Sequence, residues 1–469
     1  MALPAPTATA ATRCPPPSPV RCFSALVPLD RSGAVPGAIR IRAARIRSRR
    51  ASRPPLIGLT GGPGQAGVSY VLDYAYLLPT AGRDLVVFDQ RGTGASGLLR
   101  CPSLERSNDD SYQSAAGACG RSLGARRSFY TSADSADDLE ALRIRLGVPR
   151  IAIYSISYGS RVAIEYARRH PEHLERMILD SPVAPGAPDA LGRETLGAVS
   201  RVLRAACNLG CGGAESHPVS DVARLVKRLR RAPIRGFVRR GGNRSRVRVG
   251  ADDLLGMLVA SDLSPAFMRR IPPAVRSALA GNSGPLVRLK SGTFGGLPDR
   301  TSVFNPAVYA ATTCEEARLA WDPFAGRAAR RAQAQAVLDA TPAEAFAPFD
   351  RRAGLNFGLL PLCGSWPAPT RPAEPPLPLP TTIPTLVLSG NLDLRTPLES
   401  ARLLAKSLNA RVVTERGVGH QVLGLEPNGC ATPAIEAFLA QRPIPACDHS
   451  ASITIGRAAV RRAAVPALR

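Results

Sequence analysis

The stretch "RIAIYSISYGSRVAIEYARRH" at residues 150–170 decides the fold of this protein. Its first part is a short apolar run typical of a strand buried on both faces of a sheet, and its second part gathers apolar residues on one helical face before Pro171. Buried-strand runs also occur at residues 55–62 and 84–92, and residues 132–147 have the leucine spacing of a crossover helix. This alternation predicts an α/β fold with a mostly parallel central sheet.

The rest of the chain departs from this rhythm and then returns to it. Residues 186–364 are rich in arginine, alanine and leucine in a helical pattern, which predicts an inserted helical cap, and the proline-rich residues 366–384 predict a linker. Buried-strand patterns reappear in "PTLVLSGNLD" and "ARVVTERGVGH", and an alternating segment at 39–46 predicts an outer strand. We therefore divide the chain into a first core part at 1–185, a cap with linker at 186–378, a second core part at 379–447 and a C-terminal tail at 448–469.

Ser157 is the candidate nucleophile, because it lies where the strand of the first stretch turns directly into the helix. A serine on so sharp a turn needs small residues two positions before and after it, and Ser155 and Gly159 meet that need. A serine in such a pentapeptide is, by itself, more often an ordinary loop residue. The strand before it and the helix after it favour the catalytic interpretation.

A serine hydroxyl needs an imidazole that removes its proton during attack, and His420 is the candidate. It follows a buried-strand pattern in "GVGH", and the other four histidines fit surface positions: His170, His173, His217 and His449. The acid that orients this imidazole should end the preceding strand, as Asp393 does in "LVLSGNLDLRTP"; its alternative role is a turn or helix cap before Pro397. The order Ser, Asp, His is that of α/β hydrolases.

The glycine turn "TGGPG" at 60–64 follows an inner strand and offers unobstructed backbone N–H groups. We expect the N–H groups of Gly62 and Tyr158 to form an oxyanion hole, with Gly61 as the neighbouring alternative to Gly62. Most glycine–proline turns are only turns, so this expectation depends on the position directly after an inner strand.

Composition limits the other functions of the chain. The formal net charge is +25, but only three of the 61 basic residues are lysine. The arginine-rich stretches at 40–50 and 230–248 lack the interleaved aromatic residues that stack on bases, so we interpret them as solvated surface and expect no nucleic-acid partner. No apolar run reaches the length of about 18 residues that a membrane span requires.

The cysteines indicate the cellular compartment. The ten cysteines are an even number, scattered along the chain without paired C-x-x-C motifs beside histidines, so we expect no metal site. Such a set favours an oxidising compartment and hence a secreted or cell-envelope protein. The first residues, "MALPAPTATAATRC", do not form a complete signal peptide.

Several segments of the chain occur in the order found in one enzyme family. They are "GGPGQAG", "DLVVFDQRGTGASGLLRC", "YTSADSADDLEALRIRLG", "YSISYGSRVAIEYARRHPEHLERMILDSP", "LVLSGNLDLRTPLESA" and "GVGHQVLG". From about Cys22 to Cys447 the chain resembles the prolyl iminopeptidase and tripeptidyl aminopeptidase family, densely in the core and thinly in the cap. The resemblance implies the α/β-hydrolase fold with an inserted helical cap, no cofactor or metal, and an exported aminopeptidase that releases N-terminal proline or short N-terminal peptides.

The resemblance also implies particular disulfides and a substrate site. It pairs Cys314 with Cys363 and Cys430 with Cys447, and a further plausible pair joins Cys101 to Cys119. An aminopeptidase holds the ammonium group of its substrate with negative charge, and Glu315 and Glu316 are the candidates beside Cys314. The alternative is that these glutamates simply begin a helix.

Two positions depart from the family pattern. Thr60 stands where the iminopeptidases have histidine, which weakens the case for strict proline release. Ser155 replaces the first glycine around the nucleophile, a small change that leaves catalysis possible.

We therefore expect a serine hydrolase that forms an acyl-enzyme on a peptide or a small ester or amide. Two alternatives remain at this point. One is a carboxylesterase, or another ester or amide hydrolase, with the same three residues, because fold and triad do not determine the leaving group. The other is a catalytically silent binding protein of the same fold.

Overall fold

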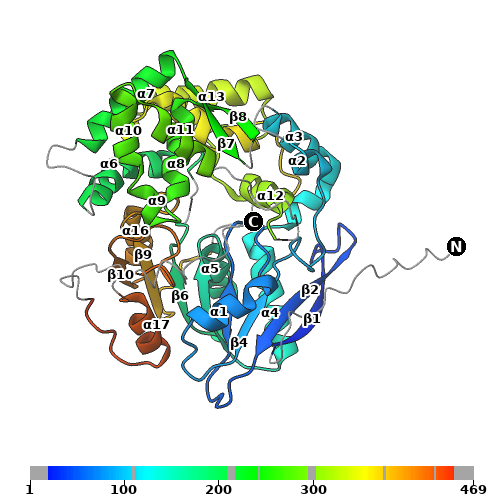
Figure 1. Ribbon diagram of the computed structural model, residues 1–469. Coiled ribbons are helices and arrows are strands. Elements are labelled where there is room, and N and C mark those ends of the chain that lie inside the picture. Colours follow the sequence, from blue (N-terminus) through cyan, green and yellow to red (C-terminus); the bar gives the residue numbers. More distant parts are fainter. Residues whose placement is uncertain are drawn as a thin grey trace.

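The computed structural model of the protein describes residues 20–447 except 108–110, 185, 187–188, 209–216, 241–242, 294–300, 302, 373–376 and 427–428. The tail expected at 448–469 lies outside the described residues. Figure 1 shows two tiers, a lower tier built around one large sheet and an upper tier of helices with a small hairpin.

The large sheet has eight strands in the order β1-β2-β4-β3-β5-β6-β9-β10. The strands are β1 Val20–Pro28, β2 Ala38–Ile46, β3 Leu56–Leu59, β4 Leu85–Phe88, β5 Ile151–Ile156, β6 Leu174–Asp180, β9 Thr385–Gly390 and β10 Arg411–Glu415. Neighbours from β4 to β10 are parallel, whereas β2 is antiparallel to both β1 and β4. The predicted α/β class with a mostly parallel sheet is therefore confirmed. The expected outer strand is β2, which lies one position inside the edge because β1, a strand that the sequence did not indicate, pairs outside it.

Helices cover both faces of this sheet, which is why its inner strands are continuous apolar runs. One face carries α4 Ser132–Leu146, α5 Gly159–Arg169 and α16 Leu398–Ser407, and the other carries α1 Val71–Leu77 and α17 Ala431–Leu439. Leu142 and Leu404 belong to the same core cluster as Ile57 on the first face. Val71 and Ile435 belong to a second cluster on the opposite face.

Helix α4 illustrates how local sequence defines an element. It begins after Thr131, whose side chain and that of Asp134 bond each other's backbone N–H groups as a capping box. Leu139 and Leu142 are buried on one face, and the helix ends at Gly147 with a φ of 68°, a conformation that glycine adopts without strain.

The segment between β6 and β9 forms most of the upper tier in Figure 1. Its described helices are α6 Arg193–Asn208, α7 Pro218–Arg231, α8 Ala251–Ser261, α9 Pro265–Met268, α10 Ile271–Leu279, α11 Gly284–Thr293, α12 Pro306–Glu316, α13 Arg327–Ala340, α14 Arg351–Phe357 and α15 Leu360–Cys363. Helices α2 Pro102–Glu105 and α3 Tyr112–Leu123, with the 3₁₀ turn η2 Gly124–Phe129, precede α4 in the chain. The described residues between α15 and β9, where the linker was expected, form no helix or strand.

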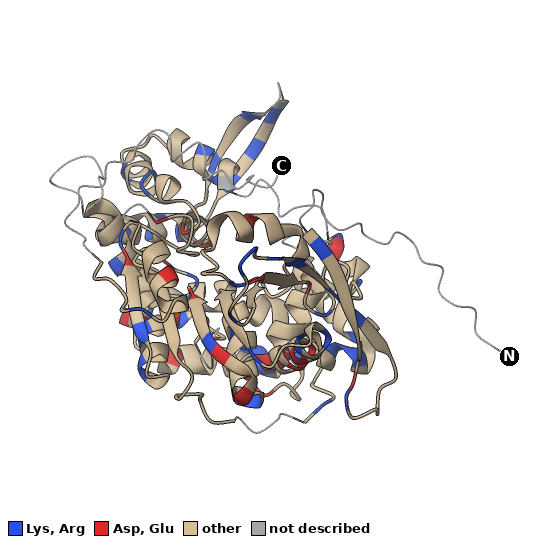
Figure 2. Cartoon of the chain, turned by 90° about the horizontal axis from the view of Figure 1, so that it is seen from below, with Lys and Arg blue, Asp and Glu red and all other residues tan. Residues whose placement is uncertain are grey.

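The cap was expected to be helical, with breaks at glycine-rich turns, and it also contains a β-hairpin that the sequence did not indicate. Strands β7 Ile234–Arg240 and β8 Asn243–Val249 pair antiparallel within the arginine-rich stretch at 230–248. Val238 and Val247 pack against the core, whereas Phe237 is 49% exposed, so alternation of the two faces produces strands here. Figure 2 shows the arginines of this hairpin at the edge of the molecule.

Disulfides join segments within both tiers. Cys101 is bonded to Cys119, Cys314 to Cys363 and Cys430 to Cys447, as the resemblance implied. Cys22 and Cys207 are also disulfide-bonded. Within the described part of the chain, no helix combines the length and the hydropathy that crossing a bilayer would need.

Candidate active site

Ser157 occupies the turn between β5 and α5 at the carboxyl end of the sheet. Its φ is 54°, which is rare for a residue with a side chain and is typical of the sharp strand-to-helix turn that carries a nucleophile. The turn is held on both sides, since the Ser157 N–H donates to the backbone oxygen of Asp180 at 2.9 Å and the Ser157 carbonyl accepts the N–H of Ser160 at 3.0 Å. The hydroxyl is therefore carried on a well-anchored turn.

The small residues around Ser157 have a direct structural reason. A Cβ on Gly159 would lie 2.8 Å from the Thr60 oxygen, so a larger residue would push α5 away from the end of β3. Ser155 is buried, and its hydroxyl donates to the backbone oxygen of Ile178 at 3.1 Å. A serine fits where the family has glycine because its hydroxyl finds this partner.

The glycine turn at 60–64 lies directly against Ser157. A Cβ on Gly61 would be 3.0 Å from the Ser157 Cβ and 3.5 Å from its Oγ. The Thr60 hydroxyl closes the turn by donating to the Gln65 oxygen at 2.9 Å. Gly62 follows Gly61 with a φ of 111°. The predicted oxyanion-hole donors, Gly62 and Tyr158, thus belong to the two backbone segments that flank the hydroxyl.

Asp393 and His420 are in direct contact. The His420 Nδ1 and the Asp393 Oδ2 are 2.9 Å apart, and both side chains are almost completely buried. The Asp393 carboxylate also accepts the backbone N–H groups of Arg395 and Thr396, each at 2.9 Å, and the Thr396 hydroxyl at 2.7 Å. These bonds hold the carboxylate toward the imidazole.

The electrostatics of this pair follow from burial and mutual charge. Burial opposes ionisation of Asp393, but the His420 charge and hydrogen bond, with the donors from Thr396, hold the pKa of Asp393 below its ordinary value. Burial likewise opposes protonation of His420, yet the charge and hydrogen bond of Asp393 raise its pKa above 6.5. The two shifts together favour an ionised Asp393 and make protonation of the His420 ring easier.

Asp180, at the end of β6, connects the His420 loop to the Ser157 turn. Its carboxylate accepts the backbone N–H groups of Val422 at 2.8 Å and Leu423 at 2.9 Å. Because β5, β6, β9 and β10 are parallel neighbours, residues that follow them meet at one edge of the sheet. Sequence reasoning missed Asp180; the available signal was an aspartate that ends a buried apolar run, in "LERMILDSP".

The Glu315 carboxylate is bonded to neighbouring side chains. It lies at the end of α12, where its carboxylate pairs with Arg127 Nε at 3.3 Å and accepts the Ser128 hydroxyl at 2.9 Å and the Trp366 indole N–H at 3.0 Å. Its side chain is only 5% exposed. These contacts tie the upper tier to the segment before α4.

Glu316 has a similar environment. It pairs with Arg161 at 3.2 Å and accepts the Ser132 hydroxyl at 2.7 Å, and burial raises its pKa. A substrate ammonium would therefore compete with Arg161 here and with Arg127 at Glu315. Amine binding by the two glutamates stays a prediction.

Three clusters of described residues have enough donors to be considered as metal sites, but in the one that contains Glu415 the other two members, Cys430 and Cys447, are joined in a disulfide. The ligand atoms of Asp262, Asp393 and His420 lie within 4.8 Å of one another, as do those of Glu140, His170 and His173. In the first cluster both carboxylates already accept several N–H groups. In the second, Glu140 is paired with Arg143 at 2.7 Å. In each of these two clusters at least one carboxylate is thus already bonded to protein donors.

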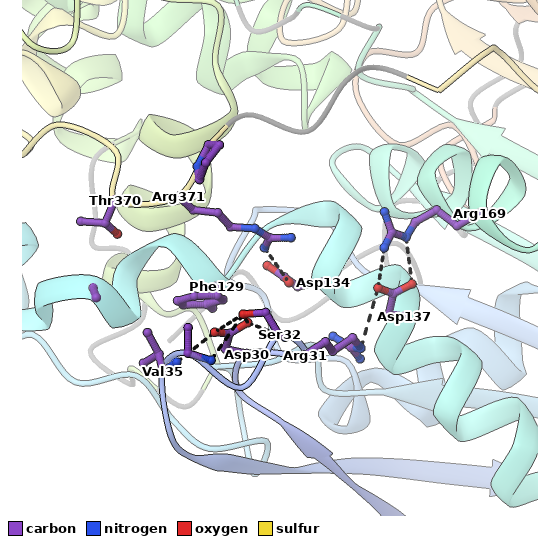
Figure 3. A pocket seen from close by; sticks show the side chains of 13 residues that line it. Asp30, Arg31, Ser32, Val35, Phe129, Asp134, Asp137, Arg169, Thr370 and Arg371 are labelled. Carbon is purple, nitrogen blue, oxygen red and sulfur yellow. Dashed lines mark hydrogen bonds and ion pairs between the residues drawn. The ribbon is translucent and has the colours of Figure 1, made fainter.

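A separate cavity of about 270 Å³ contains none of the candidate catalytic residues. Figure 3 shows that the arginines lining it point toward the carboxylates of Asp134 and Asp137. Arg371 bonds Asp134 at 3.1 Å, and Arg169 bonds Asp137 at 2.8 Å. Asp30, which also lines the cavity, is bonded to the Ser32 hydroxyl and to backbone N–H groups.

Comparison with known families agrees with the sheet and with the strand-to-helix turn. Residues 54–202, which include Ser157, match the family model of the α/β hydrolase fold. The chain has the α/β-hydrolase fold. Residues 351–451, which include Asp393 and His420, match the model described as TAP-like protein.

Relatives of this α/β hydrolase carry peptidase names. The tripeptidyl aminopeptidase of Streptomyces lividans is 25% identical in an alignment that covers 90% of this chain and 82% of the relative. The serine protease Hip1 of Mycobacterium tuberculosis is 26% identical in an alignment that covers 81% of this chain and 77% of the relative. A proline iminopeptidase of Lactobacillus helveticus is 30% identical over 142 residues, which cover 30% of this chain and 40% of the relative. These relatives confirm the family that the sequence resembled and identify the chain as a hydrolase with peptidase relatives.

Proposed function

We propose that this α/β hydrolase is an exported serine aminopeptidase that releases N-terminal proline or short N-terminal peptides, with Ser157, His420 and Asp393 as its catalytic triad. The single observation that carries the proposal is the buried bond between His420 Nδ1 and Asp393 Oδ2 at 2.9 Å, at the sheet edge where Ser157 stands on its left-handed turn.

The proposed reaction follows from that geometry. With Nδ1–H bonded to the ionised Asp393, the imidazole keeps a lone pair on Nε2 for the Ser157 proton. Ser157 Oγ then attacks the substrate carbonyl carbon, and His420 passes the proton to the leaving amine as the bond to nitrogen breaks. Water, activated by the same imidazole, hydrolyses the acyl-enzyme and releases the acyl product.

The negative charge that develops on the carbonyl oxygen needs donors that are already in position. We assign this role to the backbone N–H groups of Gly62 and Tyr158. The assignment is supported by the close approach of the Gly61 backbone to Ser157, where an added Cβ would lie 3.0 Å from the Ser157 Cβ, and by the position of Tyr158 at the N-terminus of α5. Each such donor contributes roughly 3 kcal/mol to transition-state stabilisation.

Selectivity for a free amino terminus is the finer part of the proposal. The peptidase names of the relatives support it, and Glu315 and Glu316 are the acidic groups proposed to receive the ammonium. Since each glutamate is paired with an arginine, binding would require the ammonium to share or displace that partner.

A substrate comparison tests this function. We expect hydrolysis of peptide anilides with a free amino terminus, little hydrolysis of the same anilides with a blocked amine, and covalent labelling of Ser157 by a fluorophosphonate. Equal use of blocked and free substrates, or preference for p-nitrophenyl esters, would reject the aminopeptidase in favour of an esterase. Failure to label Ser157 would favour a silent binding protein.

The disulfides support the exported part of the proposal, because such bonds persist in oxidising compartments. Fractionation of cells that produce the full chain tests it. We expect the oxidised, active protein outside the cytoplasm; a fully reduced, active cytoplasmic pool would contradict export.

A further inference from the structure

A carboxylate from the upper tier lies inside the candidate acid–base site. Asp262 follows α8 in the segment inserted between β6 and β9, and its side chain is completely buried. Its ligand atoms lie within 4.8 Å of those of Asp393 and His420. No motif marks Asp262 in the sequence, and the proposed reaction assigns it no role.

The Asp262 side chain holds the loop that carries Asp393. One oxygen, Oδ1, accepts the Arg395 Nε at 2.9 Å. The other, Oδ2, accepts the backbone N–H groups of Arg395 at 3.2 Å and Leu394 at 3.4 Å. All of these donors are N–H groups, which an ionised carboxylate accepts. The two residues that directly follow Asp393 are thereby attached to the upper tier.

The Asp262 backbone holds the loop that carries His420. Its carbonyl oxygen accepts the His420 N–H at 2.8 Å. A Cβ on Gly419 would lie 2.0 Å from the same oxygen, so the chain passes here only because residue 419 has no side chain. One residue of the inserted segment therefore contacts both loops of the proposed acid–base pair.

We propose that Asp262 is a positioning residue for the general base: it clamps the loops of Asp393 and His420 together and supplies a second negative charge beside the imidazolium. The inference rests on the proposed function. Orientation matters because small displacements of a catalytic group reduce the rate steeply. Since Asp262 belongs to the inserted segment, the geometry of the acid–base pair depends on how that segment is seated on the sheet.

The charges around Asp262 allow a test of its electrostatic effect on His420, because charges of opposite sign shift the His420 pKa in opposite directions. The groups that face it are Arg395, Asp393 and His420, and Arg395 in turn faces Tyr309. The charge of Asp262 raises the pKa of His420, and the charge of Arg395 lowers it. Removing one or the other charge should therefore move the His420 titration in opposite directions.

The experiment compares Asp262→Asn, Arg395→Gln and the control Asp252→Asn in the full chain. Asp252 is a carboxylate in α8, the helix that Asp262 follows; it is paired with Arg230 at 2.7 Å, and its side chain is 37% exposed. The measurements are kcat and KM on a hydrolysed substrate, and the rate of Ser157 labelling by a fluorophosphonate, each across about pH 5 to 9. Thermal unfolding checks that each variant is folded.

We expect Asp262→Asn to move the midpoint of the acidic limb of kcat/KM to lower pH by about one unit, because the imidazolium loses a neighbouring anion. We also expect kcat at the plateau to fall about ten-fold, with little change in KM, as the base is held less firmly. Arg395→Gln should move the same midpoint to higher pH, and Asp252→Asn should leave it unchanged. A purely structural residue would reduce activity without moving the midpoint.

The outcomes separate the two proposals. A folded Asp262→Asn enzyme with the wild-type midpoint overturns the positioning role. Should Asp262→Asn fail to fold, Arg395→Gln tests the inference in its place. The Arg395 side chain is 38% exposed, so this substitution should leave the protein folded. A midpoint of the kcat/KM profile that stays the same or moves to lower pH in Arg395→Gln contradicts the inference. Absence of Ser157 labelling in the wild-type protein at every pH overturns the proposed function itself, and the inference with it.

Discussion

The carboxylate of Asp180 accepts the backbone N–H of Val422 at 2.8 Å, so a residue at the end of β6 holds the loop that carries His420. The backbone carbonyl of the same aspartate accepts the N–H of Ser157 at 2.9 Å. Strand β6 lies between β5 and β9, and its last residue is thus a physical link between the turn of the proposed nucleophile and the loop of the proposed base.

Asp180→Asn should weaken this link. An amide would place an NH₂ group where Leu423 N–H and the Tyr154 hydroxyl now donate, leaving buried donors without acceptors. We expect a loss of about 2–3 kcal/mol in the free energy of unfolding and a lower kcat. Denaturant unfolding and initial rates measure both. Asp339→Asn, at an exposed helical position, is the control and should change stability by less than about 0.5 kcal/mol; an equal effect of both substitutions would contradict the link.

Loss of the triad residues should affect turnover far more than folding. Ser157→Ala and His420→Ala should each reduce kcat on the order of a million-fold, and Asp393→Ala somewhat less, because attack needs both hydroxyl and base. Initial rates with equal amounts of folded protein measure the loss. Near-full activity of Ser157→Ala would end the proposed mechanism. Combining two of the substitutions should add little, since the residues act as a unit.

Gly61→Ala should act on the Ser157 side chain. The new Cβ would lie 3.0 Å from the Ser157 Cβ, so the Ser157 side chain, which carries the hydroxyl, would have to give way slightly. We expect kcat to fall at least ten-fold, because a misplaced nucleophile loses its alignment. Gly197→Ala in α6 is the matched control: its new Cβ meets only the Ala345 oxygen at 3.9 Å, and it should leave kcat unchanged and stability equal or slightly higher. Equal kcat values for both variants would argue against the close approach.

The His420 pKa predicts the direction of two pH dependences. The base must be neutral to accept a proton, so activity should fall as pH drops, with a midpoint above 6.5 because the folded-state pKa is raised. The raised pKa of His420 also stabilises the folded state. This stabilisation is fully present below pH 6.5, the pKa of the unfolded-state histidine, and is lost as pH rises through the higher pKa of the folded state. Comparing wild type with His420→Gln by denaturant unfolding across this window checks the sign. A wild-type advantage that grows with rising pH would contradict it.

Much of the fold was predictable because it depends on short-range patterns. Buried-strand runs, the capping box of α4 and the small residues around Ser157 are each encoded within a few neighbouring positions. The resemblance supplied the cysteine pairs. The pattern at 230–248 was interpreted only as solvated surface, because arginine exposure on one face of a hairpin resembles a charged helix in composition.

The amino-acid sequence by itself determined the parallel α/β sheet, the turn at Ser157 and the order of the three candidate catalytic residues. Only the tertiary structure decided that Asp180 and Asp262 form hydrogen bonds with the loops of those residues. It likewise decided that Glu315 is paired with Arg127 and Glu316 with Arg161. The physical reason is range. Periodicity and capping act between residues a few positions apart, whereas these contacts join residues more than a hundred positions apart, which meet only when the strands and the inserted segment have packed.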